Sequence, residues 1–592
     1  VKMKSDIGVV DRPLQFALAA LKSGETACIT NLETKDMATA TKRTGKQKTT
    51  GSKETASKSN SRPGAFLQQA FEEKGLMQNP FMALLFGAIL GLSAPGLEQW
   101  YLAWFALAPL FLMIYASQSL IRQWLLGLCF GLGYNLVYLH WYLNLAPLDW
   151  MGFPGLAGTG LSVLAWLIVS FHQALIISIF SVVAARLPIC AGFTFKRADQ
   201  KQGGKWMIPA LSVIPLVWVL IVNKIGNSPD FLGVPWSMLE YTQYRQGMLI
   251  QGASVFGGIG LSYVLVAANL AFACLFAAFT EIPALKRLFA ENKDSAFYYC
   301  LGTALLMGAY VAPGLVQGSN INLKPEHNVA ILEGAINIDM QKTSHRYSLA
   351  EIMGRYDLLF KTAGTDNLHG LTVLPEGALP AYLNECPEVL NWLKKTAAEH
   401  KTDIVVGAMD RQSLDHPYNA AFGVSSSGLK CQEAYHKRYL VPLGEYTPLF
   451  VKYLPEWVRR WTNTPSGSGF AAGKQPALLP LNLARVGPLI CFESISPELT
   501  AATCREGAEL LVNISDLAWF HKSNCGKQML AFAVFRAVEN RRYFVFAANT
   551  GPSALIDARG TIAEYGQQDE SKVVCGKVGL NSSITPFALW YR

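Results

Sequence analysis

Residues 485–493 read RVGPLICFE, a short apolar run that ends in a cysteine and a glutamate. Its β-branched and aliphatic side chains predict a buried strand, with Cys491 at the end of that strand. Five similar runs lie in the later half of the chain: NVAILEG (328–334), LTVLPEG (371–377), DIVVGAM (403–409), ELLVNIS (509–515) and YFVFAAN (543–549). Helical patterns at 386–399 and 526–541 separate several of them, so residues 317–580 are expected to form an α/β domain around a buried sheet.

The earlier half of the chain has a different pattern, in which seven apolar runs without charged side chains follow one another. They cover about 81–96, 101–117, 124–145, 157–184, 207–223, 258–279 and 296–315. Most approach or exceed the ~20 residues that a spanning helix needs. Residues 80–316 are therefore predicted to form a membrane domain of about seven transmembrane helices. The composition, 51% hydrophobic and 16% charged, agrees with one membrane half and one soluble half.

Lysine and arginine are unevenly distributed among the segments between these runs. Residues 37–80 and the loops on the same side carry 17 of them, whereas the opposite side carries only Lys224 and Arg245. The positive-inside rule then places the N-terminus in the cytoplasm, and seven crossings place residues 317–580 on the periplasmic face. The net charge of +9 is accordingly attributed to cytoplasmic loops rather than to nucleic-acid binding.

The two ends of the chain are interpreted as accessory segments. Residues 1–79 are expected to be a disordered basic extension, because the stretch after Met37 is rich in Lys, Thr and Ser and cannot bury a core. Met37 would be a natural start, so residues 1–36 are interpreted as a dispensable or non-native leader. A cleaved signal peptide is not expected, since no apolar segment with a cleavage site precedes the first run. Residues 581–592 are expected to be a C-terminal tail.

Three segments place a reactive side chain where a strand gives way to a loop, which is where α/β sheets carry their sites. They are LPEGALP (374–380) with Glu376, YHKRYLVPLGEYTPL (435–449) with Lys437, and PLICFES (488–494) with Cys491. Taken singly, such residues are more often a solvated glutamate, a surface lysine and a core cysteine. The scattered cysteines and histidines lack metal-ligand spacing, so neither a metal nor another cofactor is expected.

Taken together, in this order and spacing, the three segments resemble the carbon-nitrogen hydrolase (nitrilase) superfamily. The resemblance implies an αββα sandwich in which Cys491 is the nucleophile, Glu376 the base and Lys437 the group that supports the oxyanion. This chemistry needs these residue types, because a thiol must lose its proton to attack an acyl carbon and the adduct carries a negative oxygen. The resulting thioester passes its acyl group either to water or to an amine.

A nitrilase-like domain that follows a multi-span bundle is similar to the apolipoprotein N-acyltransferase family. Further matches to that family are GVPW (233–236), AWF (518–520), FRAVENRR (535–542) and AANTG (547–551). The resemblance covers residues 80–590 and implies a multi-pass protein of the cytoplasmic (inner) membrane. It also implies the reaction: an acyl chain passes from a phospholipid to Cys491, and then to the α-amino group of the N-terminal diacylglyceryl-cysteine of a lipoprotein.

The resemblance also implies supporting residues. Glu445 matches a glutamate that assists the triad, Phe492 stands where the family commonly has tyrosine, and Glu493 matches the next residue. Trp236 and Trp519 match aromatic residues at the acyl-chain entrance. A further aromatic cluster, YLHWY (138–142), is interpreted as a belt at the membrane interface.

The sequence departs from the family at three places. It reads SDLAW (515–519) where SNDAW is frequent, and PEGA (375–378) where PETA is frequent. It stops at ITPFALWYR, where the family usually has an eighth span, so the later domain is expected to be anchored at one end only.

Two other functions are considered. One is a membrane-tethered amidase with the same site and water as the acceptor. The other is a multi-span transporter with an inactive outer domain, which the lack of charged residues in the seven runs disfavours. The six cysteines of the later half permit disulfides, but sequence does not give their pairing.

Overall fold

The computed structural model describes most of the chain after the N-terminal extension. The described residues are 78–148, 153–187, 190–194, 205–209, 213–226, 235–279, 293–319, 324–336, 347–364, 368–413, 416–427, 434–441, 444–446, 469–566 and 571–591. The expected disordered extension, apart from its last two residues, lies outside this part of the chain.

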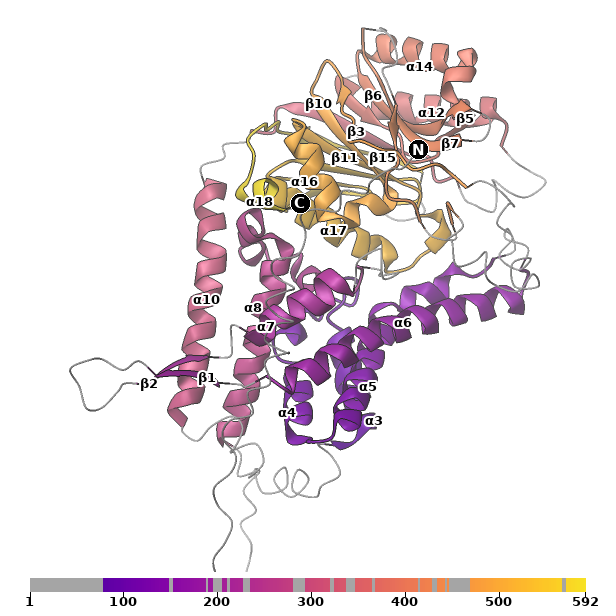
Figure 1. Ribbon diagram of the computed structural model, residues 1–592. Coiled ribbons are helices and arrows are strands. Elements are labelled where there is room, and N and C mark those ends of the chain that lie inside the picture. The colour runs from indigo at the N-terminus through magenta and orange to yellow at the C-terminus, as the bar shows by residue number, and fades with distance from the viewer. Residues whose placement is uncertain are drawn as a thin grey trace, which may run out of the picture. The chain divides into compact units, whose positions relative to one another are not determined.

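Helices follow one another from Pro80 to Ser319, and each of the seven apolar runs contains helix (Figure 1). They are α3 (Pro80–Gly91), η2 (Trp100–Trp104) with α4 (Ala108–Ala116), α5 (Leu120–Tyr138), α6 (Leu156–Ala184), α7 (Val213–Trp218) with η6 (Val219–Ile225), α8 (Ala253–Phe279) and α10 (Lys293–Ser319). Shorter turns are η3 (His140–Leu145), η8 (Leu239–Gln243) and η9 (Leu249–Gly252). Among the described residues, four stretches are long and apolar enough to cross a membrane: Leu120–Tyr138, Leu156–Ala184, Leu249–Phe279 and Phe297–Gly318.

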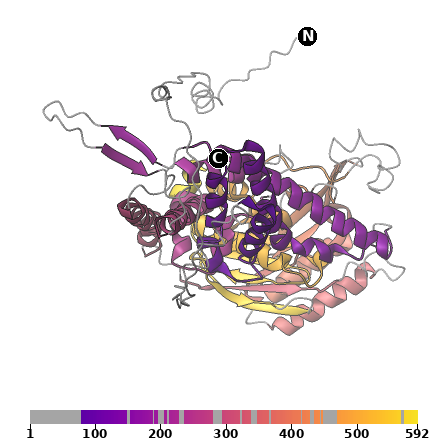
Figure 2. The ribbon, with the colours of Figure 1, turned by 90° about the horizontal axis from the view of Figure 1, so that it is seen from below.

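Two of the predicted runs differ from the helices that form. The run 124–145 is interrupted, because α5 ends at Tyr138 and a separate 3-10 turn, η3, follows. The run 207–223 begins in a strand: β1 (Cys190–Thr194) and β2 (Lys205–Pro209) pair antiparallel. This pairing uses the backbone groups of residues 205–209, so the helix starts only at Val213. The β1–β2 hairpin extends away from the helices (Figures 1 and 2).

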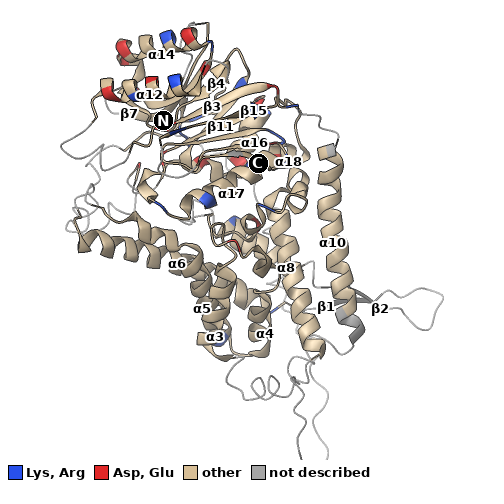
Figure 3. Ribbon diagram, turned by 180° about the vertical axis from the view of Figure 1, so that it is seen from behind, with Lys and Arg blue, Asp and Glu red and all other residues tan. Residues whose placement is uncertain are grey.

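The helices present apolar side chains outward and pack through small residues inside. Leu164, Ile168 and Leu305 are each more than half exposed. Gly133 of α5 packs so tightly on α3 that a Cβ there would lie 1.9 Å from the carbonyl oxygen of Leu84. Lys, Arg, Asp and Glu residues are frequent along the α/β part and rare along these helices (Figure 3). Outward-facing leucine and isoleucine with small residues at helix contacts are typical of a membrane protein.

In the described part of the later half, the strands form two sheets, each with three parallel central strands. The first has the order β15-β3-β4-β6-β7-β8, with β5 paired to β6. Its strands are β3 (His327–Glu333), β4 (Gly370–Val373), β5 (Leu379–Tyr382), β6 (Asp403–Ser413), β7 (His416–Val424), β8 (Tyr435–His436) and β15 (Lys572–Val578). The second has the order β14-β13-β12-β11-β10-β9. Its strands are β9 (Leu479–Pro480), β10 (Arg485–Ile490), β11 (Leu510–Ser515), β12 (Phe544–Ala548), β13 (Ala554–Ile556) and β14 (Ile562–Tyr565).

The six strands predicted from sequence are β3, β4, β6, β10, β11 and β12, the parallel strands at the centres of the two sheets. These strands are buried on both faces and therefore read as continuous apolar runs. The two predicted helices are α14 (Pro387–His400) and α17 (Cys525–Asn540). The remaining strands and the helices α12 (Leu349–Ala363), α16 (Pro497–Arg505) and α18 (Pro586–Trp590) were not predicted.

The two sheets face each other across a shared apolar layer. Val329 and Val405 of the first sheet pack in it with Val486, Val512 and Val545 of the second. Helices α12 and α14 pack on the outer face of the first sheet, whereas α16 and α17 pack on the outer face of the second. The layer order is therefore αββα, which confirms the predicted nitrilase-like sandwich.

Helix α17 lies between the sandwich and the membrane helices, and all of its residues except Lys527 are buried. At its end, Arg541 donates to Gln251 Oε1 at 2.6 Å, to the carbonyl oxygen of Gly314 at 2.7 Å and to Ser254 Oγ at 3.1 Å. Near the C-terminus, the indole N–H of Trp590 in α18 donates to the carbonyl oxygen of Val255 at 2.7 Å. Non-covalent contacts of Arg541 and Trp590 therefore also join the sandwich to the membrane helices.

Candidate active site

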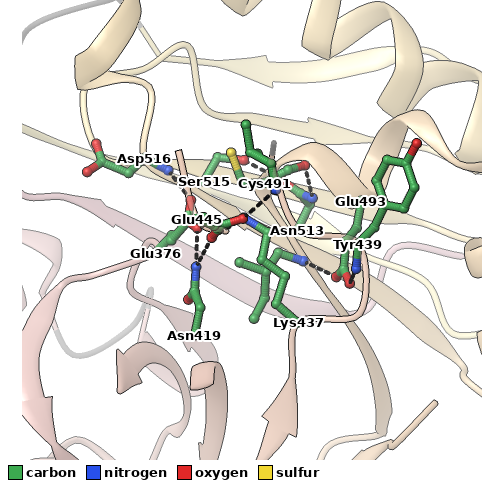
Figure 4. Close-up of polar contacts among 12 residues, drawn as sticks. Glu376, Asn419, Lys437, Tyr439, Glu445, Cys491, Glu493, Asn513, Ser515 and Asp516 are labelled. Carbon is green, nitrogen blue, oxygen red and sulfur yellow. Dashed lines mark hydrogen bonds and ion pairs between the residues drawn. The ribbon is translucent and has the colours of Figure 1, made fainter. Parts of the chain in front are cut away.

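The three residues predicted to form the site come together from both sheets (Figure 4). Glu376 follows β4, Lys437 follows β8, and Cys491 begins the turn η12 (Cys491–Ile495) directly after β10. Lys437 Nζ lies 3.2 Å from Glu376 Oε1, and Cys491 lies near enough for the charges of both residues to act on its thiol. The three side chains are thus brought to one place, although 115 residues separate the first from the last.

Cys491 stands at a sharp bend between a strand and a turn. Its φ of 50° lies in the left-handed region, which a non-glycine residue adopts only where its surroundings hold it. Its carbonyl oxygen accepts from Asn513 Nδ2 at 3.1 Å and from Ser494 Oγ at 3.2 Å. These bonds secure the bend, which turns the sulfur out of the β10 ladder toward Glu376.

A second carboxylate and an amide complete a ring around the lysine. Glu445 Oε1 lies 2.9 Å from Lys437 Nζ. The side-chain amide of Asn419, in β7, donates one hydrogen bond to Glu376 Oε1 at 2.7 Å and another to Glu445 Oε1 at 2.9 Å. Glu376, Lys437, Glu445 and Asn419 therefore form a closed ring of four side chains (Figure 4).

The outer oxygens of both carboxylates accept from the main chain. The N–H of Asp516 donates to Glu376 Oε2 at 2.8 Å, and the N–H of Val441 donates to Glu445 Oε2 at 2.9 Å. Each carboxylate thus has an ammonium and an amide on one oxygen and a backbone N–H on the other. Such donors favour the charged form of a carboxylate and fix its orientation.

The ring holds two carboxylates and one ammonium, so its charges do not cancel. Lys437 is 1% exposed; burial lowers the pKa of its ammonium, but attraction to Glu376 and Glu445 outweighs burial and raises that pKa. Burial raises the pKa of the Cys491 thiol, and the two carboxylates raise it further against the opposing effect of Lys437. In the resting site, cysteine is therefore a thiol and lysine an ammonium.

Glu493 does not belong to the ring. It is fully buried and accepts from the N–H groups of Arg438 at 2.6 Å, Tyr439 at 3.1 Å and Ile490 at 2.7 Å, and from the Tyr435 hydroxyl at 2.9 Å. One carboxylate thus ties the segment on either side of Lys437 to the strand that precedes Cys491. This geometry gives Glu493 a structural position beside the site.

Aromatic rings join the site to the membrane helices. Phe492 stacks between Tyr439, at 5.5 Å between ring centroids, and Trp236, at 5.6 Å. Trp236 contacts Trp141 of η3 at 4.9 Å, and both tryptophans are only 2% exposed. The interpretation of 138–142 as an interface belt is therefore wrong for Trp141, which lies inside the molecule.

Trp519 is half-buried in η13 (Ala518–Phe520), which extends these contacts toward the membrane helices. Its neighbour Phe520 packs edge-on against Trp141 at 5.2 Å. The structure thus brings Trp236 into direct contact with Phe492, whereas Trp519 stands beside the aromatic cluster.

Three polar residues of the site were missed from the sequence. Asn419 and Asn513 interrupt otherwise apolar strands, HPYNAAFGV (416–424) and LLVNIS (510–515), and that interruption was the available signal. Asp516 falls in the SDLAW segment that departs from the common pattern. Since its contact with Glu376 uses the backbone N–H, that contact does not depend on the side chain at this position.

Comparisons with known proteins match both halves of the chain. Residues 315–584 match the carbon-nitrogen hydrolase family, and residues 86–271 match the apolipoprotein N-acyltransferase N-terminal domain. An apolipoprotein N-acyltransferase of Geobacter metallireducens is 32% identical over 508 residues, which are 84% of this chain and 89% of that protein. One of Nostoc sp. is 27% identical over 80% of this chain and 87% of that protein. Among solved structures, Saccharomyces cerevisiae Nit3, a member of the nitrilase superfamily, matches 43% of this chain and 91% of its own with 16% identity and a TM-score of 0.34.

Proposed function

The chain belongs to the apolipoprotein N-acyltransferase family, membrane enzymes of the nitrilase superfamily, and we propose that it acts through a thioester on Cys491. In this proposal a phospholipid donates its sn-1 acyl chain, and the α-amino group of a lipoprotein's N-terminal diacylglyceryl-cysteine accepts it. The observation that carries the proposal is that Glu376, Lys437 and Cys491 come together at one place, with Lys437 Nζ 3.2 Å from Glu376 Oε1 (Figure 4).

The first half-reaction forms the thioester. Glu376 takes the thiol proton while sulfur attacks the ester carbonyl carbon. The negative oxygen of the adduct needs donors, and Lys437 has three N–H groups, of which Glu376 and Glu445 use two. The third can donate to this oxygen. When the C–O bond breaks, the proton on Glu376 passes to the leaving alkoxide and lysophospholipid departs.

The second half-reaction transfers the acyl group to nitrogen. The neutral α-amine attacks the thioester carbonyl, and Glu376 takes the proton that this nitrogen loses. The C–S bond then breaks, the sulfur recovers the proton from Glu376, and an amide is released. Every proton taken by Glu376 is returned within the same half-reaction, so the enzyme ends as it began.

The charge of the ring explains why a base beside the sulfur is needed. Two carboxylates face one ammonium, and this excess of negative charge and burial together raise the Cys491 pKa. A thiolate made by losing the proton to solvent would therefore be rare at neutral pH. Transfer of the proton to Glu376 leaves the net charge of the site unchanged.

The aromatic contacts suggest how the lipid reaches the sulfur. Phe492 directly follows Cys491 and stacks on Trp236, which contacts Trp141 of the helical part. We assign Trp236 and Trp519 to the acyl-chain path, because aromatic rings beside membrane helices suit a hydrocarbon chain. A site that adjoins the bilayer receives two lipid-anchored substrates without extracting them fully.

The side of the membrane follows from the basic residues. With the N-terminus inside, the sandwich would face the periplasm, where exported lipoproteins are found. A cysteine introduced at Asn320 should then react with an impermeant thiol reagent in intact spheroplasts, whereas one introduced between residues 196 and 205 should not. The opposite labelling pattern would reject this orientation.

The reaction itself is tested with purified full-length protein, phosphatidylethanolamine and a diacylglyceryl-cysteinyl peptide. We expect N-acyl peptide and lysophospholipid in equal amounts, and an acyl adduct on Cys491 when the peptide is omitted. Cys491→Ala should abolish both, whereas Cys386→Ala, which removes a half-buried thiol that is not part of the ring, should change neither. Rapid hydrolysis of small amides without transfer to the peptide would show a tethered amidase instead.

A further inference from the structure

We propose that Asn419 is a positioning residue that makes Oε2 of Glu376 the atom that accepts the Cys491 proton. This inference rests on the proposed role of Glu376 as the base. Asn419 lies in β7, and its side chain donates to Glu376 and Glu445, so we take it to act through these two carboxylates.

Asn419 is bound to the site through both its side chain and its main chain. Its amide nitrogen carries two hydrogens, and both are used, one on each carboxylate. Its carbonyl oxygen accepts the backbone N–H of Lys437 at 2.9 Å. The same residue therefore sets the position of the lysine backbone and the orientation of both carboxylates.

The count of lone pairs on Glu376 identifies the basic oxygen. A carboxylate offers about four acceptor positions, two on each oxygen. On Oε1, Lys437 and Asn419 occupy both. On Oε2, the N–H of Asp516 occupies one, so one position remains for the proton of the thiol. Without Asn419, one acceptor position on Glu376 Oε1 becomes vacant. The thiol proton can then go to Oε1, the oxygen that faces Lys437.

Lys437 does not hold Glu376 in place as closely as Asn419 does. The lysine lies 3.2 Å from Glu376 but 2.9 Å from Glu445, whereas the amide of Asn419 lies 2.7 Å from Glu376. Asn419 also bridges two like charges that would otherwise repel each other. Its removal should let the two carboxylates separate, with the ammonium following the nearer one, Glu445.

The test uses full-length protein in detergent and two readouts. The first is the rate at which iodoacetamide alkylates Cys491 across pH 5–9, followed by mass spectrometry of the Cys491 peptide; it reports proton transfer and needs no acyl donor. The second is the kcat and KM of acyl transfer from phosphatidylethanolamine. The variants are Asn419→Ala, the isosteric Asn419→Asp and the control Asn482→Ala. Asn482 donates its amide to Asp403, Ser425 and Ser426 at a distance from the ring.

We expect Asn419→Ala to lower kcat by about tenfold or more, the range for losing a hydrogen bond to a charged group, with KM unchanged. Because Asn419→Ala removes a donor that holds the proton acceptor of the thiol, Cys491 alkylation at neutral pH should slow and its pH profile should shift. Asn419→Asp keeps the shape but replaces two donors by a third negative charge, so its effect at neutral pH should be larger. Asn482→Ala should match the wild type.

Two results would overturn the role of Asn419. One is wild-type alkylation and kcat in both variants; the other is a rise in KM alone with an unmoved pH profile. Because alkylation needs no lipid, the proposed function can fail separately. A protein that transfers no acyl group but shows the shifted alkylation profile would refute the acyltransferase mechanism and still support the role of Asn419.

Discussion

Replacement of Arg541 by alanine should loosen the sandwich from the membrane helices. Arg541 is fully buried at the end of α17 and donates to oxygens on η9, α8 and α10. Burial and repulsion from Arg559 lower the pKa of its guanidinium to about 10, so it remains charged at neutral pH. A charged donor with several well-placed acceptors is expected to contribute more than an ordinary surface arginine.

The magnitude follows from the two shortest of these bonds, to Gln251 Oε1 at 2.6 Å and to the Gly314 carbonyl at 2.7 Å. A hydrogen bond to a charged group contributes about 1.5–3 kcal/mol, so the two bonds give roughly 3–6 kcal/mol. The cost of burying the guanidinium offsets part of this, and we expect a net loss of about 3 kcal/mol. If residues 317–580 unfold as one unit, that loss corresponds to a fall in Tm of roughly 5 °C.

Thermal unfolding of the full-length protein in detergent measures this loss. Arg559→Ala is the matched control, because Arg559 is an exposed arginine with a longer bond, 3.2 Å, to the Gly318 carbonyl. It should change Tm by less than about 2 °C. In Gln251→Leu, the further effect of Arg541→Ala should be smaller than in the wild type, since the two residues share a bond. An Arg541→Ala protein that unfolds at the wild-type temperature would refute this account of the junction.

Four further changes address the site. Glu376→Gln should slow acyl-enzyme formation at neutral pH by about 100-fold, with alkylation of Cys491 then rising steadily with pH because its raised pKa keeps it a thiol; normal thioester formation would exclude Glu376 as the base. Lys437→Met should lower kcat by about 100-fold at every pH up to 9, since the raised pKa keeps the lysine charged throughout that range; a loss confined to high pH would contradict this. Phe492→Ala should raise KM for phospholipid more than it lowers kcat, as two stacked contacts are lost, and an unchanged KM would count against the aromatic path. Glu493→Gln should slow thioester formation by about tenfold, because four donors lose a charged acceptor; a wild-type rate would show that this anchor does not affect the site.

Much of this protein could be predicted from local sequence signals. A charge-free run such as 157–184 predicts a membrane-spanning helix, because it is long enough to cross the bilayer and its side chains are apolar. The six parallel strands appear as continuous apolar runs because both of their faces are covered. Glu376, Lys437 and Cys491 were found because each ends a strand within a recognisable short motif.

The contacts that complete the site could not be read in this way. Asn419 and Glu376 are 43 residues apart, and the N–H of Asp516 is 140 residues from the carboxylate that it binds. Periodicity reports whether a residue is buried but not which residue it meets, so these partners are decided only when the two sheets pack. A backbone N–H is present at nearly every position and gives no signal in the sequence at all.

The junction with the membrane helices is likewise a property of the folded protein. The segment FRAVENRR reads as a charged, amphipathic helix end, yet Arg536, Glu539, Arg541 and Arg542 are all buried. Trp141 reads as an interface residue, yet it packs against Trp236 beside the site. The charge or aromatic character of a side chain indicates which surroundings it prefers, whereas its burial depends on which element packs over it in the folded protein. The sequence alone therefore determines the two halves and their reactive residues, and the tertiary structure decides how the halves meet and how the proton acceptor is held.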